Sequence, residues 1–303
     1  MILAVREPAV RAYAASRRRR LSEPIVVRRN DPLFPRSLLE HAPPDQLWCL
    51  GNPELLNAEP MVAIVGTRNP TAYGERIARE LAASVARAGG CVVSGMARGI
   101  DAAAHRGALD AGGSTIAVLG TGVDVVYPAA HRPLHAEIVA SGLVISEMPP
   151  GQPGFKGCFP RRNRIIAGLS GVAVIVEAGF RSGALNTSEW ARKFGREVAG
   201  VPGPIDSPLS TGVNLLIRDG AHMLTGIDDL ATIAKFAYVP RPTCEPASED
   251  ERAVYAALEG GELPPDVVAA RTRLPIARCL AAVTSLELAG MIEASLGGTI
   301  RRR

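Results

Sequence analysis

The sequence predicts an α/β protein built on an extended Rossmann-like parallel sheet with helices on both faces, plus a small C-terminal winged-helix-like domain. Short, continuously apolar runs recur through the middle of the chain, and Gly-rich turns and helix-like segments separate them. Strands buried on both faces produce such runs, and regular alternation with helices is typical of a parallel sheet. The expected strands are residues 62–65, 91–94, 115–119, 143–146, 172–176 and 197–199.

The segments between these strands carry the spacing of amphipathic helices. Ile77, Leu81 and Val85 recur at four-residue intervals within 75–88, and residues 100–111 form the next expected helix. Residues four apart share one face of a helix, and that face packs on the sheet. Loops that leave parallel strands gather at one edge, where such folds bind ligands. The Gly-rich or charged loops expected at that edge are residues 66–68, 94–99, 120–122 and 181–183.

The C-terminal segment has a different pattern. Its apolar positions suit three short helices before a Gly-Gly turn, which resembles a winged helix-turn-helix. Acidic and basic residues nearly balance there, which favours a packing or partner surface, although Arg271, Arg273 and Arg278 could support DNA reading. The expected organisation is an arginine- and proline-rich extension with a short ordered lead-in (1–60), a Rossmann-like domain (61–237), a linker (238–250) and a winged-helix-like domain (251–303).

Composition narrows the function classes. The 303 residues are 47% hydrophobic and 21% charged, as in an ordinary globular protein of two domains. No apolar run reaches the about 18–20 residues of a membrane span, and the arginine run 17–20 follows the first apolar residues, which is the wrong order for a secretory signal. We therefore expect a cytoplasmic protein that does not enter a membrane.

Metal and cofactor sites are not expected. The five cysteines include no Cys-x-x-Cys pair, which argues against a zinc site or a disulfide framework. The net charge of +4 is modest, so nucleic-acid binding requires a local basic patch and not a globally basic chain.

The stretch 159–170 is the strongest candidate for such a patch. It places Phe159, Arg161, Arg162, Asn163 and Arg164 directly before an apolar, helix-like run. Guanidinium groups fit phosphate oxygens, a helix start offers unpaired N–H groups, and an aromatic ring can stack on a base. The combination indicates a site for a single nucleic-acid strand, and a solvated basic turn is the alternative.

Gly66-Thr67-Arg68 ends the first strand without the motif of a dinucleotide-binding loop or of a P-loop. Arg68 is expected to point toward the ligand crevice, with pairing to Asp101 as the alternative. Asp101 itself suits the start of a helix, where a carboxylate caps N–H groups and meets the positive end of the helix dipole.

Glu177 and Arg181 leave an enzyme open. Nucleotide phosphoribohydrolases have a related fold, but their Pro-Gly-Gly-x-Gly-Thr loop is absent here. Glu177 could act as a general base, although orienting a loop or an arginine is the favoured role. A third hypothesis is a regulator that reads duplex DNA through the winged helix.

Taken together, these motifs resemble the DNA-processing protein A family (DprA, also called Smf). The likeness covers roughly residues 31–233 and, more weakly, the C-terminal segment. The motifs that carry it, in order, are residues 65–68 with 73–74, 94–105, 120–124 with 127–128, 159–170, 182–185 with 187, 201–203, and 212–217 with 220–221.

The resemblance implies a non-enzymatic protein that binds single-stranded DNA, forms a homodimer and loads the recombinase RecA during natural transformation. No cofactor and no metal are implied, and recognition of sequence is expected to be weak because phosphate contacts do not read bases. The DNA-binding residues carried over or expected from the loops are Gly66, Thr67, Arg68, Ser94, Gly95, Arg98, Phe159, Arg161, Arg162, Asn163, Arg164, Ser182 and Gly183.

Overall fold

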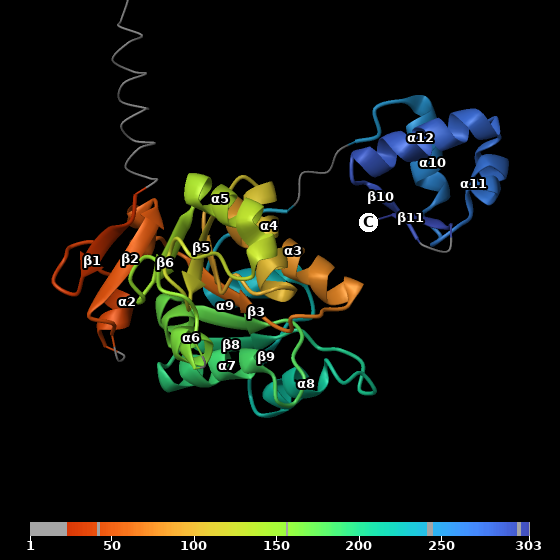
Figure 1. Ribbon diagram of the computed structural model, residues 1–303. Helices are drawn as coiled ribbons and strands as arrows, with labels where there is room; N and C mark the ends of the chain where they lie inside the picture. Colours follow the sequence, from red (N-terminus) through yellow and green to blue (C-terminus); the bar gives the residue numbers. More distant parts are fainter. Residues whose placement is uncertain (1–22, 41–42, 156, 241–244, 296–297, 303) are drawn as a thin grey trace, which may run out of the picture. The chain divides into compact units, whose positions relative to one another are not determined.

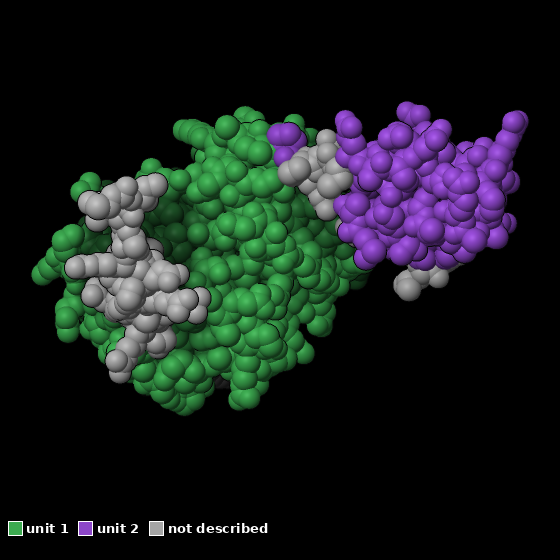
Figure 2. Space-filling model, turned by 90° about the horizontal axis from the view of Figure 1, so that it is seen from above, with its two compact units in different colours: residues 1–239 green, residues 240–303 purple. Residues whose placement is uncertain are grey.

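The computed structural model describes residues 23–40, 43–155, 157–240, 245–295 and 298–302. The arginine run 17–20 and Cys244 lie outside them. The chain divides between Val239 and Pro240 into two compact units, which we call unit 1 and unit 2 (Figure 2). Each unit is described by itself.

Unit 1 is built on one sheet, which has nine strands among the described residues (Figure 1). The strand order is β1-β2-β6-β5-β4-β3-β7-β8-β9. The neighbours from β6 to β9 are parallel, whereas β1 pairs with β2 and β2 with β6 in antiparallel fashion. The strands are β1 (Ile25–Arg28), β2 (Gln46–Gly51), β3 (Met61–Val65), β4 (Cys91–Ser94), β5 (Ser114–Leu119), β6 (Leu143–Ser146), β7 (Val172–Ile175), β8 (Glu197–Gly200) and β9 (His222–Met223).

Helices cover both faces of this sheet, as the sequence predicted, because successive residues of each central strand point to opposite sides. In β3, Ala63 and Val65 belong to one hydrophobic core, and Val62 and Ile64 to another. The first face is covered by α2 (Arg36–Leu39), α6 (Cys158–Leu169), α7 (Gly183–Lys193) and α8 (Thr211–Arg218), and the second by α3 (Ala72–Arg87), α4 (Ile100–Asp110), α5 (Arg132–Ser141) and α9 (Ile227–Ala234).

The N-terminal part of unit 1 contributes more than the expected lead-in. Strands β1 and β2 precede residue 61 and extend the same sheet, because β2 forms a ladder with β6. Two short 3₁₀ helices, η1 (Pro53–Asn57) and η2 (Ala129–His131), complete unit 1. Within the described residues, no helix combines the length and the apolar character that crossing a bilayer requires.

Unit 2 contains α10 (Glu249–Ala257), α11 (Pro265–Thr272) and α12 (Ile276–Leu288), followed by the antiparallel hairpin of β10 (Ile292–Ala294) and β11 (Ile300–Arg302). It has a core of its own, in which Val254, Val268 and Leu286 are buried together. Three helices followed by a hairpin confirm the expected winged-helix arrangement.

Candidate nucleic-acid interface

A pocket of about 260 Å³ lies where β3, β4 and β7 end. These strands are neighbours in the sheet, so their carboxyl ends open onto the same edge. Segments far apart in the sequence therefore meet there. The pocket brings together eight of the expected residues, namely Gly66, Thr67, Arg68, Phe159, Arg162, Asn163, Ser182 and Gly183, and its lining also includes Ala97, Asp101, Ile166, Ala184 and Thr187.

Arg68 is exposed at the end of β3. It lines this pocket and also a neighbouring hollow of about 470 Å³, shared with Arg79, Arg106 and His131. Among the ion pairs that the described residues form within 4.0 Å, none involves Arg68, so the alternative of a close pair with Asp101 is not what the structure shows. Its guanidinium is thus presented to solvent at the rim of both hollows.

Arg162 faces inward. It is 7% exposed, and its guanidinium donates hydrogen bonds to the carbonyl oxygens of Gly95 (2.7 Å) and Val118. A Cβ at Gly95 would lie 2.5 Å from Nη2 of Arg162, so only glycine leaves room for the guanidinium. Burial lowers the pKa of Arg162 to about 10, an effect that Asp101 opposes, and the group remains a cation at neutral pH. Arg162 therefore fastens α6 to the loop after β4.

The loop after β4 does not offer its N–H groups freely. Asp101 is buried in the first turn of α4, and its Oδ2 accepts hydrogen bonds from the N–H groups of Gly95 (3.1 Å) and Ala97 (3.3 Å). Burial raises the pKa of this carboxyl, and Arg162 is the main opposing influence. Ser94 is also buried, with Oγ donating to the carbonyl of Ile64 (2.7 Å). Ser94 and Gly95 thus hold the pocket floor, while Arg98 is exposed outside the pocket lining.

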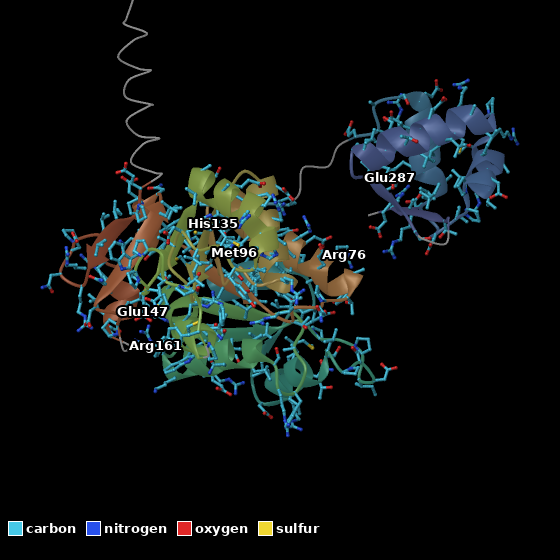
Figure 3. All side chains as sticks on the ribbon, viewed as in Figure 1. Arg76, Met96, His135, Glu147, Arg161 and Glu287 are labelled. Atoms are coloured by element: carbon cyan, nitrogen blue, oxygen red, sulfur yellow. The ribbon has the colours of Figure 1, made fainter. Side chains whose placement is uncertain are left out.

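Arg161 and Arg164 share one carboxylate partner. Arg164 forms an ion pair with Glu147 in which the side chains are 11% and 12% exposed. Arg161 lies 3.8 Å from Glu147, measured from Nε to Oε2, and remains 61% exposed (Figure 3). Of the arginines in the stretch 159–170, Arg161 is therefore the one whose side chain is open to solvent.

Phe159 forms an aromatic pair with Tyr127 at the rim of the pocket. Their ring centroids are 5.3 Å apart and their planes are inclined by 36°. A Cβ at Gly120 would lie 3.0 Å from the Phe159 ring, and one at Gly154 would lie 3.3 Å away. These two glycines leave space for the ring. Tyr127 is 54% exposed, and the sequence gave it no site role because its motif carries no charge.

The start of α7 closes the pocket on the side opposite Arg68. Oγ of Ser182 accepts a hydrogen bond from the N–H of Ala184 (3.3 Å) and so caps the helix. Nδ2 of Asn163 donates to the carbonyl of Gly183 (3.2 Å) and lies 3.4 Å from Oδ1 of Asn186. Asn163 therefore ties α6 to the start of α7.

Glu177 has the loop-orienting role that the sequence favoured, although its partner is a threonine and not an arginine. Its buried carboxylate accepts hydrogen bonds from the N–H (2.9 Å) and the hydroxyl of Thr71. Thr71 in turn caps α3, since its Oγ1 accepts from the N–H of Gly74 (3.1 Å). A Cβ at Gly74 would lie 2.4 Å from Cδ of Glu177. Glu177 fixes the segment that follows Arg68 and is not a free general base.

Comparison with known proteins places the chain. A family model described as DNA recombination-mediator protein A matches residues 25–235, and one described as the DprA winged helix domain matches residues 239–298. A putative DNA processing protein DprA of Mycobacterium tuberculosis is 46% identical over 256 residues, covering 82% of this chain and 66% of that protein, which is slightly under two thirds of its length. Protein Smf of Escherichia coli is 39% identical, covering 80% of this chain and 68% of its own length.

Two solved structures share the fold. DprA from Streptococcus pneumoniae superimposes with a TM-score of 0.67 at 38% identity, over 78% of this chain and 84% of that one. DprA from Helicobacter pylori, whose structure is described in terms of its single-stranded DNA binding mode, gives 0.65 at 29% identity, over 71% and 98%. The matched family model spans most of unit 1, and the chain belongs to the DNA recombination-mediator protein A family, also known as DprA or Smf.

Proposed function

We propose that the chain binds single-stranded DNA in the pocket at the edge of the sheet and acts as a recombination mediator. The observation that carries this proposal is the convergence of Arg68, Phe159, Asn163 and the start of α7 on one pocket. A cation, an aromatic face and a helix N-terminus together suit one phosphate and one unpaired base. The description of the Helicobacter relative as a single-stranded DNA binder supports the same ligand.

The arginines divide into two groups in this proposal. Arg68 and Arg161 are exposed and neutralise phosphates, whereas Arg162 and Arg164 are buried against carbonyl or carboxylate oxygens and hold the pocket in shape. Phe159 stacks on a base beside Tyr127. Because the contacts are to phosphates and to a base face, binding is expected to depend weakly on sequence.

The proposal extends to partners. A mediator described by its role in DNA recombination must pass its strand to a recombinase, so we include loading of RecA and a homodimer that holds two strand segments. The place of action in this proposal is the cytoplasm. Glu177 is held by Thr71, which argues against the alternative of a nucleotide hydrolase that uses it as a base.

The test is a charge reversal at Arg68. Binding of fluorescent oligo-dT at moderate salt is measured by anisotropy for Arg68→Glu and for Arg218→Glu, which makes the same charge change at a 70% exposed arginine on α8. We expect Arg68→Glu to weaken binding about tenfold or more, since hydrogen bonds to charged groups contribute about 1.5–3 kcal/mol, and Arg218→Glu to change it far less. Equal affinity of Arg68→Glu and the parent protein would rule out the pocket.

A further inference from the structure

The exposed face of α12 in unit 2 is apolar. Leu288 is 85% exposed and Leu280 is 45% exposed, and Ala277, Ala281 and Thr284 are exposed beside them. At 100° per residue these five positions fall within an arc of roughly 100° on one side of the helix. The opposite side already packs into the core of unit 2, so this second apolar face is not needed for folding.

This face is unsuited to DNA. In a helix-turn-helix the second helix, here α12, enters the major groove and needs cations for phosphates. Arg278 on α12 donates to both carboxylate oxygens of Asp250, at 2.8 and 2.6 Å. In the hairpin, Arg301 is ion-paired with Glu293, and the guanidinium of Arg302 lies 4.1 Å from the centre of the Tyr255 ring. These cations are engaged within unit 2.

The order of residues along the face is nearly symmetrical about the level of Ala282. Ala277 and Leu288 lie at comparable distances from that level on either side, as do Leu280 and Thr284. Two such helices in antiparallel contact therefore place Leu280 of each against Thr284 of the other. Small side chains at positions 277 and 281 allow the backbones to approach closely.

The charges at the two ends of α12 favour the same arrangement. Arg273 is exposed just before the helix, and Glu287 is exposed in its last turn. Antiparallel contact brings the basic end of one helix to the acidic end of the other and also opposes the helix dipoles. A parallel contact would place like charges together.

We propose that the α12 face of unit 2 is a contact between two copies of this chain, formed by antiparallel α12 helices about a twofold axis. An isologous contact of this kind uses the same patch on both copies. It gives the proposed homodimer a surface, and it couples two strand-binding pockets through effective concentration. The contact rests on unit 2 and requires no DNA.

The experiment places a cysteine close to the twofold axis of the full-length chain. Ala281→Cys is compared with Ala256→Cys, which introduces a cysteine at an exposed alanine of α10 off the face. Both carry Cys244→Ser, and Cys49, Cys91, Cys158 and Cys279 are buried. After mild oxidation without DNA, non-reducing electrophoresis measures the covalent dimer. We expect about tenfold more dimer from Ala281→Cys, because a residue at the centre of an interface meets its own copy.

A second variant keeps the interpretation specific. Adding Leu280→Glu and Leu288→Glu to Ala281→Cys is expected to abolish the dimer, and because both leucines are exposed, circular dichroism is expected to be unchanged. Equal cross-linking of Ala281→Cys and Ala256→Cys, a purely monomeric Ala281→Cys protein, or loss of duplex DNA binding on adding the two glutamates would each overturn the proposal. Oligo-dT affinity of the same variants is measured separately, so failure of this contact is distinguishable from failure of the pocket.

Discussion

Phe159 is positioned before any ligand reaches it. Tyr127 packs against one side of its ring, and Gly120 and Gly154 leave space for the ring where a Cβ would crowd it. A base that stacks on Phe159 therefore meets a surface already held in place, and little side-chain freedom is lost on binding.

Replacement of the ring tests this stacking. Phe159→Leu keeps an apolar side chain of similar volume, and we expect it to cost about 1–3 kcal/mol of binding to oligo-dT, the usual range for loss of base–aromatic stacking. Anisotropy titrations at one salt concentration measure the change. Tyr127→Phe is the matched control, since it retains both rings and is expected to bind like the parent protein. Undiminished affinity of Phe159→Leu would remove stacking from the mechanism.

His105 shows how a fully buried polar residue can fix its own protonation state. The Thr115 hydroxyl donates its proton to the carbonyl of Val92 (2.8 Å), so it can only accept from Nδ1 of His105 at 2.7 Å. Nδ1 therefore carries the hydrogen, and Nε2 is buried with no acceptor among the described residues. Burial, with smaller contributions from Arg162 and His131, lowers the pKa of His105 to about 3.

This pKa predicts a loss of stability in mild acid. The unfolded chain takes up a proton on His105 below about pH 6.5, whereas the folded chain does so only near pH 3, so stability falls as the pH drops through that window. Between pH 7 and pH 5 we expect the parent protein to lose about 1–2 kcal/mol more than His105→Phe. Urea midpoints at both pH values measure it. The raised pKa of Asp101 acts in the opposite sense, but it is common to both proteins. Equal pH dependence would contradict the assignment.

Arg162 marks what sequence reasoning could and could not reach. The sequence predicted a basic patch but treated its three arginines alike. The distinction follows from helical phase: Arg162 precedes Ile165, Ile166 and Leu169 by three, four and seven residues, the spacing of one buried face. That signal was present in the sequence. The carbonyls that receive the guanidinium were not predictable, because they come from β5 and the loop after β4, which only the tertiary fold brings together.

At the scale of elements, long-range pairing separates what was predicted from what was missed. Strands β4 and β6 have the predicted bounds because each is a short, fully buried apolar run. β1 has a single buried residue, and β9 has only two residues, both exposed, so neither gives an apolar run. Antiparallel addition of β2 to β6 depends on contacts about a hundred residues apart and carries no local signal.

The cap of α3 predicts the effect of a change at Glu177. In Glu177→Gln the amide retains one acceptor oxygen but turns a donor group toward the two donors of Thr71. We expect the free energy of unfolding to fall by about 1–3 kcal/mol, as for loss of a buried charged hydrogen bond. Urea denaturation measures it, and the circular dichroism spectrum checks that the fold is retained.

The control for this change is Glu80→Gln, which breaks an exposed ion pair with Arg76 on the same helix and is expected to cost less than about 1 kcal/mol. If the two variants were equally stable, the carboxylate of Glu177 would not be holding Thr71, and its availability as a base would have to be reconsidered.

For the whole molecule, local arrangement of charge matters more than net charge. The chain carries only +4, and many of its arginines are engaged with carboxylates or carbonyl oxygens. Attraction for a polynucleotide therefore depends on the few guanidinium groups that remain exposed around the pocket, which makes salt dependence a measure of which arginines meet phosphate.

Each phosphate neutralised on a single strand contributes about 0.7 to the slope of log affinity against log salt concentration. We therefore expect Arg68→Gln and Arg161→Gln each to lower that slope by about 0.7. Arg162→Lys is expected to weaken binding by loosening the pocket while leaving the slope unchanged, because the Arg162 guanidinium is committed to Gly95 and Val118. Titrations with oligo-dT at several salt concentrations separate the two effects. A reduced slope in Arg162→Lys would show that this buried arginine meets phosphate after all, and would require the pocket to open when the strand enters.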